Sequence, residues 1–285
     1  MLDRLVVVLY TPRMPECFGR SAALISVGAV VAMIAVTASE PWAQSPAVGV
    51  QRLQGKPNLS GIWQAVNEAH WDIQAHAARP GPTQFGALFS EPAGLGVVDG
   101  NEIPYQPWAA EKKKENFAKR WQLDPEAKCY MPGIPRATYM PFPFQIVQGT
   151  NKILISYAFA NAGRLIHMDK VDDSPADTWM GWSRGRWAGD TLVVDVTSFL
   201  DQTWFDRAGN FHSEALHVIE RYTPMGANML QYEATIEDPK VFTRPWKMSM
   251  PLYRRQEKNA QLLEFQCVPF SEELLYGDLR RRTAN

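Results

Sequence analysis

The sequence predicts a mainly β protein built as an antiparallel up-and-down barrel, with a Pro-rich N-terminal extension that carries one helix and with a short C-terminal helix. Two observations support this prediction. Between residues 184 and 254, short segments alternate apolar and polar residues, as antiparallel strands with one buried face do. Short turn sequences separate most of these segments, whereas a sandwich would need longer crossovers. Closing such a sheet leaves no strand edge exposed.

Residues 1–43 have the pattern of a secretory signal peptide. Three Arg residues precede an apolar run from Ser21 to Ala38, and the Ala43-Gln44 junction offers a small-residue cleavage site. The alternative is a membrane anchor, but the run is about as short as the shortest spanning helix and contains Ser, Gly and Thr. No later segment is apolar enough to span a bilayer, so we expect a periplasmic or secreted protein with no membrane span after processing.

Export makes the cysteines of the mature chain informative. Cys17 lies in the signal, which leaves Cys129 and Cys267 as an even pair in an oxidising compartment, and we predict a disulfide between them. In the chain-entropy model, a bridge that closes so long a loop stabilises the fold by about 4 to 5 kcal/mol. The alternative is two buried free thiols. Neither cysteine belongs to a CxxC pair or a His cluster, so we expect neither redox catalysis nor a structural metal.

The composition restricts the classes of partner. Of the 285 residues, 46% are hydrophobic and 10 are Trp, so the chain can bury a sizeable core. The 29 basic and 30 acidic residues give a formal net charge of -1, whereas nucleic-acid binders carry a clustered excess of Lys and Arg. We therefore expect no nucleic-acid partner. No motif indicates a cofactor, and a small molecule is the expected ligand or substrate.

Residues 44–143 form the predicted N-terminal extension. Pro and Gly are dense in this region, so we expect mostly ordered loop. The extension contains the first strand, near Trp63, and one helix from about Pro107 to Trp121. Proline at position 107 suits the first turn of that helix, because its missing N–H needs no partner there.

Residues 144–285 form the predicted barrel. Turn sequences such as Gly149-Thr150-Asn151 and Gly189-Asp190 separate the apolar runs. A closing helix is expected from Ser271 to Arg282. The predicted strands are 144–148, 153–159, 164–169, 191–197, 216–222, 229–237, 246–252 and 262–268.

Two sets of motifs resemble known families. Ser60-Gly61-Ile62-Trp63 resembles the Gly-x-Trp sequence that opens the first strand of lipocalin-like (calycin) barrels, in which the Trp fills the barrel floor. Three longer motifs resemble a largely uncharacterised family of secreted bacterial proteins, common in soil organisms. These motifs are Gly185-Arg186-Trp187-x-Gly189-Asp190-Thr191-Leu192-Val193-Val194-Asp195, His212-Ser213-Glu214-Ala215-Leu216-His217-x-x-Glu220-Arg221 and Asp238-Pro239-Lys240-x-x-Thr243-Arg244-Pro245-Trp246. The resemblance implies an exported, lipocalin-like barrel and brings no activity with it.

Glu220 is the most informative charged residue. It stands in register with Val218 and Tyr222 on one face of a predicted strand, and an unpaired buried carboxylate costs several kcal/mol. Such a group is partnered or borders a wet cavity, so a polar-lined interior is expected. One interpretation is a structural ion pair of Glu220 with an Arg on a neighbouring strand, for which Arg244 and Arg254 are the candidates.

The other interpretation of Glu220 is acid/base catalysis. Burial would raise the pKa of its carboxyl group, and a loop histidine such as His212 titrates near neutrality, so the two could pass a proton across a substrate. Asp206 lies in the same ionisable stretch, and these three are the predicted catalytic residues. The step from His212 to His217 places the two rings on opposite faces of a strand, which argues against a metal site.

Aromatic and polar side chains near strand ends are the predicted ligand contacts. An exposed indole can stack on a ring while its N–H finds a polar partner. The alternative is that most of these Trp residues are core plugs. The predicted ligand-binding residues are Tyr157, Trp204, His217, Tyr232, Arg244 and Trp246.

Two functions are compatible with these residues. The favoured prediction is a periplasmic or secreted barrel that binds a small amphipathic or aromatic molecule in a polar-lined cavity. The alternative is a cofactor-free lyase, isomerase or hydratase that uses Glu220 and His212 as acid and base. An enzyme needs two titratable groups within reach of one substrate position, whereas a binding protein needs only a polar cavity.

Overall fold

The computed structural model describes residues 49–81 and 90–268. The predicted signal peptide (1–43) and the predicted helix from Ser271 to Arg282 lie outside these residues. The described residues all belong to one compact unit. In the part of the chain that is described, no helix has both the length and the apolar character that crossing a membrane requires.

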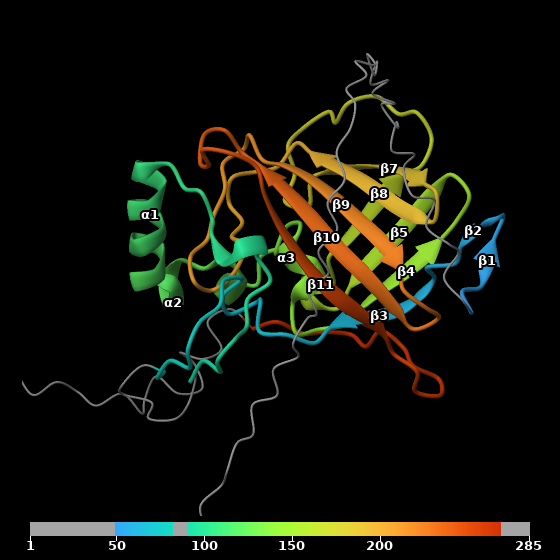
Figure 1. Ribbon diagram of the computed structural model, residues 1–285, viewed down its shortest axis with the longest axis horizontal. Helices are drawn as coiled ribbons and strands as arrows, with labels where there is room; N and C mark the ends of the chain where they lie inside the picture. Colours follow the sequence, from blue (N-terminus) through green and yellow to red (C-terminus); the bar gives the residue numbers. More distant parts are fainter. Residues whose placement is uncertain (1–48, 82–89, 269–285) are drawn as a thin grey trace, which may run out of the picture. The chain divides into compact units, whose positions relative to one another are not determined.

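The fold is mainly β and centres on a closed barrel (Figure 1). Within the described residues, nine strands form the barrel, and each pairs with its neighbours in chain order until the last closes onto the first. These strands are β3 (Gly61–Ala65), β4 (Phe144–Gln148), β5 (Lys152–Tyr157), β6 (Gly163–His167), β7 (Trp182–Ala188), β8 (Thr191–Thr197), β9 (His217–Pro224), β10 (Met229–Glu237) and β11 (Trp246–Arg254). A separate two-stranded ribbon, β1 (Arg52–Leu53) and β2 (Lys56–Pro57), precedes them.

One pair of neighbouring strands is parallel, which corrects the expectation of an entirely antiparallel barrel. β6 and β7 run in the same direction, with Ile166 opposite Ser183. The reason is geometric: strands that alternate in direction can close into a ring only when their number is even. A ring of nine therefore needs one parallel pair. A parallel pair also needs a crossover of a dozen or more residues, and residues 168–181 provide it.

The strand predictions agree with the structure in the hairpins and fail at two places. The predicted bounds of β4, β8 and β10 are those observed. β7 has no predicted counterpart, because Ser183 and Gly185 occupy inward positions where a large apolar residue would mark a strand. The strand predicted at 262–268 is wrong, since residues 262–268 have no regular secondary structure. The closed barrel has no free edge to pair with them.

Short helices lie in the extension between β3 and β4. The predicted helix from Pro107 to Trp121 corresponds to α1 and the beginning of α2, with a break at Lys119. Pro107 occupies the first turn as expected. The helices are α1 (Pro107–Ala118), α2 (Arg120–Leu123) and α3 (Arg136–Tyr139), with 3-10 turns η2 (Asp99–Asn101), η3 (Pro125–Lys128) and, between β5 and β6, η4 (Phe159–Asn161).

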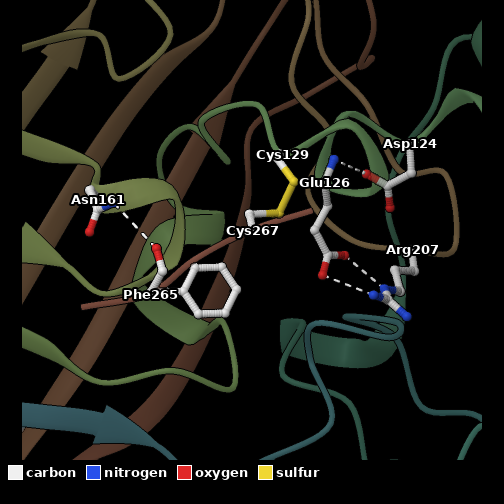
Figure 2. The surroundings of a disulfide bond; sticks show 7 residues. All are labelled: Asp124, Glu126, Cys129, Asn161, Arg207, Phe265 and Cys267. Atoms are coloured by element: carbon white, nitrogen blue, oxygen red, sulfur yellow. Dashed lines mark hydrogen bonds and ion pairs between the residues drawn. A yellow bond between two sulfur atoms is a disulfide. The ribbon is translucent and has the colours of Figure 1, made fainter. Parts of the chain in front are cut away.

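A buried charged network fixes the extension in place. Arg136 donates to both oxygens of Asp124, at 2.8 and 2.9 Å, and to Glu126 at 2.9 Å. Arg207, from the loop between β8 and β9, donates to both oxygens of Glu126 at 2.7 and 2.9 Å (Figure 2). Paired charge-assisted hydrogen bonds of this kind hold both partners in fixed orientations. The network therefore links the extension to a barrel loop.

Trp63 and Arg254 pack together at one end of the barrel. The Trp63 side chain is fully buried, its indole N–H donates to the Leu59 carbonyl, and the Arg254 guanidinium lies 4.3 Å from its ring. The arrangement depends on Gly61, because a Cβ there would lie 2.1 Å from Arg254 Nη1. Gly61 also has a φ of +148°, which side-chain-bearing residues rarely adopt. The Gly-x-Trp sequence thus serves a close packing contact.

The predicted disulfide between Cys129 and Cys267 is confirmed (Figure 2). It ties the irregular segment 255–268, which follows the last strand, to the extension. Phe265 of that segment packs against Phe142 and Phe159, with ring centroids 4.6 and 5.3 Å apart. The Phe265 carbonyl also accepts a hydrogen bond from Asn161. A covalent bond and an aromatic cluster therefore hold a segment that forms no strand.

Candidate functional site

The charged cluster predicted inside the barrel is present and is centred on Glu220. Glu220 lies on β9 opposite Ala234 and Val194, and its side chain is fully buried. Its carboxylate accepts hydrogen bonds from Arg164 Nη2 at 2.7 Å and from two tyrosine hydroxyls, Tyr222 at 3.0 Å and Tyr232 at 2.8 Å. Each of the two carboxylate oxygens therefore accepts at least one hydrogen bond from the protein.

The partner of Glu220 differs from both predicted candidates. Arg164 lies on β6, with β7 and β8 between it and β9, so the ion pair crosses the barrel interior. Arg244 is exposed and lies 3.8 Å from Glu102, and Arg254 lies over Trp63 at the barrel end. The prediction assumed neighbouring strands, whereas closing the sheet brings distant strands face to face.

The electrostatics of the cluster keep Arg164 charged and the tyrosines neutral. Burial alone would lower the pKa of Arg164, but the facing carboxylate of Glu220 outweighs it and raises this pKa above its usual value. Burial, together with the negative charge of Glu220, raises the pKa of Tyr222 and Tyr232 well above 10. Both hydroxyls therefore remain hydrogen-bond donors at physiological pH.

Several buried donor groups of the cluster lack well-formed hydrogen bonds. Arg164 Nε and Nη1, the Tyr157 hydroxyl and the Thr138 hydroxyl are buried, and none makes a hydrogen bond of good geometry, although the hydroxyls of Tyr157 and Thr138 lie close enough to interact with each other. Burial raises the pKa of Tyr157 to about 12, so its hydroxyl also keeps its proton. The great majority of buried polar atoms in folded proteins bind protein, water or ligand. These atoms, from β6, β5 and α3, are buried donors whose hydrogen-bonding capacity the protein does not fully use.

His212 and Asp206, the other predicted catalytic residues, lie in the loop between β8 and β9. His212 Nδ1 donates to the Ser213 carbonyl at 2.8 Å, so its Nε2 accepts from the Thr203 hydroxyl at 2.6 Å. Burial lowers the pKa of His212, which leaves the ring neutral. None of the contacts described in residues 49–81 and 90–268 joins His212 to Glu220.

Asp206 organises the same loop. Its carboxylate accepts from the backbone N–H groups of Ile73 and Asn210, at 2.9 and 3.1 Å, and from the Asn210 side chain. Burial, together with the nearby charge of Asp72, raises the pKa of Asp206 to about 7. These contacts hold the loop against the extension and lie apart from the Glu220 cluster.

The predicted ligand-binding residues fall into two groups. Tyr157 and Tyr232 are inside the barrel and belong to the Glu220 cluster. Trp246 is buried against Phe205 and Phe242, and its indole N–H has no hydrogen-bond partner. Trp204 is half-buried and forms a β-bridge to Phe211, Arg244 is exposed, and His217 lies on the outer face of β9.

His217 is clamped by two carboxylates on the outer face. Its Nε2 lies 3.0 Å from Asp195 and its Nδ1 lies 3.0 Å from Glu237. Burial alone would lower the pKa of His217, but the hydrogen bonds to Asp195 and Glu237 outweigh burial and raise it above 6.5. His217 therefore stabilises the fold when protonated.

We expect His217→Gln to destabilise the protein in a pH-dependent manner. Because the folded-state pKa is raised, the stabilisation is fully present below the unfolded-state pKa and is lost as the pH rises through the folded-state value. Urea unfolding of wild type and variant should therefore differ at about pH 5.5 and converge by about pH 8.5. An equal difference in unfolding free energy at both pH values would contradict this assignment.

Sequence reasoning missed Arg164 and Thr138. Arg164 and Ile166 are buried on the same face of β6. Like Glu220, Arg164 is a charged residue in a series of apolar strand positions, and this pattern could have identified it. Thr138 lies in α3, a four-residue helix with no periodicity to detect.

The fold and the cluster define a closed β-barrel protein with a charged pair in its interior. Comparison of the chain with protein-family models, with curated proteins and with solved structures found no match. Within the described residues, no group of three or more His, Cys, Asp or Glu side chains is arranged to hold a metal ion.

Proposed function

We propose that this protein is an extracytoplasmic barrel that binds a small amphipathic or aromatic molecule beside the Arg164–Glu220 pair. The observation that carries the proposal is the group of unpartnered buried atoms on Arg164, Tyr157 and Thr138. Their burial without partners is costly unless a bound molecule or water supplies acceptors.

The chemistry of the cluster defines the class of ligand. Arg164 has N–H groups left to donate, and its charge is already balanced by Glu220. A ligand therefore needs acceptor oxygens, such as carbonyl or hydroxyl groups, but no net charge, because an added charge would lack a counterion in the interior. Ile155 and Val194 are among the apolar neighbours, which suits an apolar or aromatic body.

Burial of the cluster affects how the ligand enters. Glu220 and Tyr232 have no exposed surface, so a covering segment must move before a molecule can reach them. Association and release should then be slow, and a ligand acquired in the cell should remain bound during purification.

Binding is favoured over acid/base catalysis for a geometric reason. The Glu220 carboxylate already accepts bonds from Arg164, Tyr222 and Tyr232, and His212 has other partners. A general base must reach a substrate proton. The disulfide supports the predicted export, because such bonds persist in oxidising compartments, and a lipocalin-like relationship remains a prediction.

Tyr157→Phe tests the proposal with little risk to the fold. Because the Tyr157 hydroxyl makes no hydrogen bond of good geometry and interacts only with the Thr138 hydroxyl, its removal should leave the unfolding free energy within about 0.5 kcal/mol of wild type or raise it slightly. The same change should reduce the fraction of protein that carries a bound small molecule in native mass spectrometry.

Tyr222→Phe is the matched control. Its hydroxyl bonds to Glu220 and Arg164, so removal should cost about 1.5 to 3 kcal/mol of unfolding free energy. Comparable destabilisation by both changes would mean that the Tyr157 hydroxyl is structural. A wild-type protein that carries no bound molecule after export would argue against the proposed function.

A further inference from the structure

A cavity lies at the end of the barrel where Trp63 and Arg254 pack. It has a volume of about 270 Å³ and is bounded by residues 49–51, the segment before β3 and the β9–β10 turn. None of its lining residues belongs to the Glu220 cluster. The cavity is therefore a separate feature of the molecule.

Arg254 supplies the charge of this cavity. It is the one charged residue in the described lining. Its guanidinium donates to the carbonyls of Ala227, Ser60 and Asn58, all of them neutral acceptors. Among the ion pairs of residues 49–81 and 90–268 none involves Arg254. Burial lowers the pKa of this group, and no nearby carboxylate offsets the effect. Arg254 is thus a partly buried cation without a counterion.

The other walls divide into polar and apolar sides. Asn228 and Ser60 line the cavity together with Arg254. The partly exposed Val50 and the exposed Ala227 supply apolar surface, whereas Trp63, Leu230 and Pro224 are buried. The guanidinium has five N–H groups, and its three acceptors leave others able to donate. A planar carboxylate matches guanidinium geometry, and the apolar side suits a short hydrocarbon or aromatic body.

We propose that this cavity binds a small organic carboxylate, with its anionic group on Arg254 and its apolar part against Val50 and Ala227. The site differs from the one beside Glu220 in its ligand class, because the barrel interior favours an uncharged molecule. It also differs in access, since the β9–β10 turn that borders it is exposed at Ala227 and Asn228.

Isothermal titration of the purified mature protein with benzoate, and with benzamide as its neutral isostere, tests the proposal. Benzoate should bind the wild type and benzamide should not. Asn228→Asp places a like charge in the lining and should weaken benzoate binding about tenfold or more. Asn151→Asp makes the same change in the β4–β5 turn, outside the lining, and should leave binding unchanged.

Arg254 is tested by a second pair of variants. Arg254→Gln removes the positive charge and should abolish benzoate binding, whereas Arg254→Lys keeps the charge and should retain part of it. Thermal unfolding identifies any variant that fails to fold. If an Arg254 variant does not fold, the effect of Asn228→Asp on benzoate binding tests the proposal instead. The proposal is overturned if wild type does not bind benzoate or if benzamide binds equally well. It is also overturned if Asn228→Asp binds benzoate as tightly as the control Asn151→Asp does.

Discussion

Replacing Glu220 with Gln should destabilise the barrel by about 3 to 5 kcal/mol, because the change leaves Arg164 charged and buried without a counterion. Gln keeps the size of the side chain and can still accept hydrogen bonds from Tyr222 and Tyr232. The loss therefore reports on charge rather than on packing. Guanidinium unfolding followed by far-UV circular dichroism measures it.

The double variant Arg164→Met/Glu220→Met is the control for this experiment. Replacing both members of a buried ion pair with apolar residues of similar volume is often neutral or stabilising, so the double variant should regain most of the stability lost in Glu220→Gln. An unfolding free energy of Glu220→Gln within about 1 kcal/mol of wild type would contradict the buried pair.

Removing the disulfide should have the second large effect. Cys129 and Cys267 are separated by 138 residues, a span that includes strands β4 to β11. The double variant Cys129→Ser/Cys267→Ser should lose about 2 to 5 kcal/mol of unfolding free energy, the range for native disulfides, because its unfolded chain is less constrained. Guanidinium unfolding under non-reducing conditions measures this loss.

The disulfide variant should also release the segment 255–268 before the barrel unfolds. Lys258 is exposed in this segment, and trypsin cleavage after it should accelerate in the variant while the barrel resists digestion. Phe265→Ala, which keeps the disulfide but removes the aromatic anchor, should show a smaller acceleration. Equal cleavage rates in wild type and the disulfide variant would mean that the disulfide does not hold the segment.

The barrel could be predicted from sequence wherever strand alternation reflects one buried face. β8 and β10 have large apolar residues at their inward positions, and their bounds were correct. β7 lacks that signal, because a Cβ on its inward Gly185 would lie 2.6 Å from Ile166 and 2.5 Å from Met168. The parallel pair followed from the number of strands, so missing β7 also hid the crossover.

The candidate site could be predicted only in part. The position of Glu220 in an apolar series correctly indicated a buried, partnered carboxylate. Its partner Arg164 could not be chosen over Arg244 or Arg254, because contacts across a barrel depend on closure rather than on strand order. The position of His212, locked between Thr203 and Ser213, depends on loop packing that carries no sequence period.

The most direct test of the account is a high-resolution crystal structure of protein purified from its export compartment. The binding proposal predicts electron density for a small organic molecule that accepts hydrogen bonds from Arg164 Nη1 and the Tyr157 hydroxyl. Side chains packed against those atoms, or ordered water alone in a cavity too small for anything larger, would contradict it.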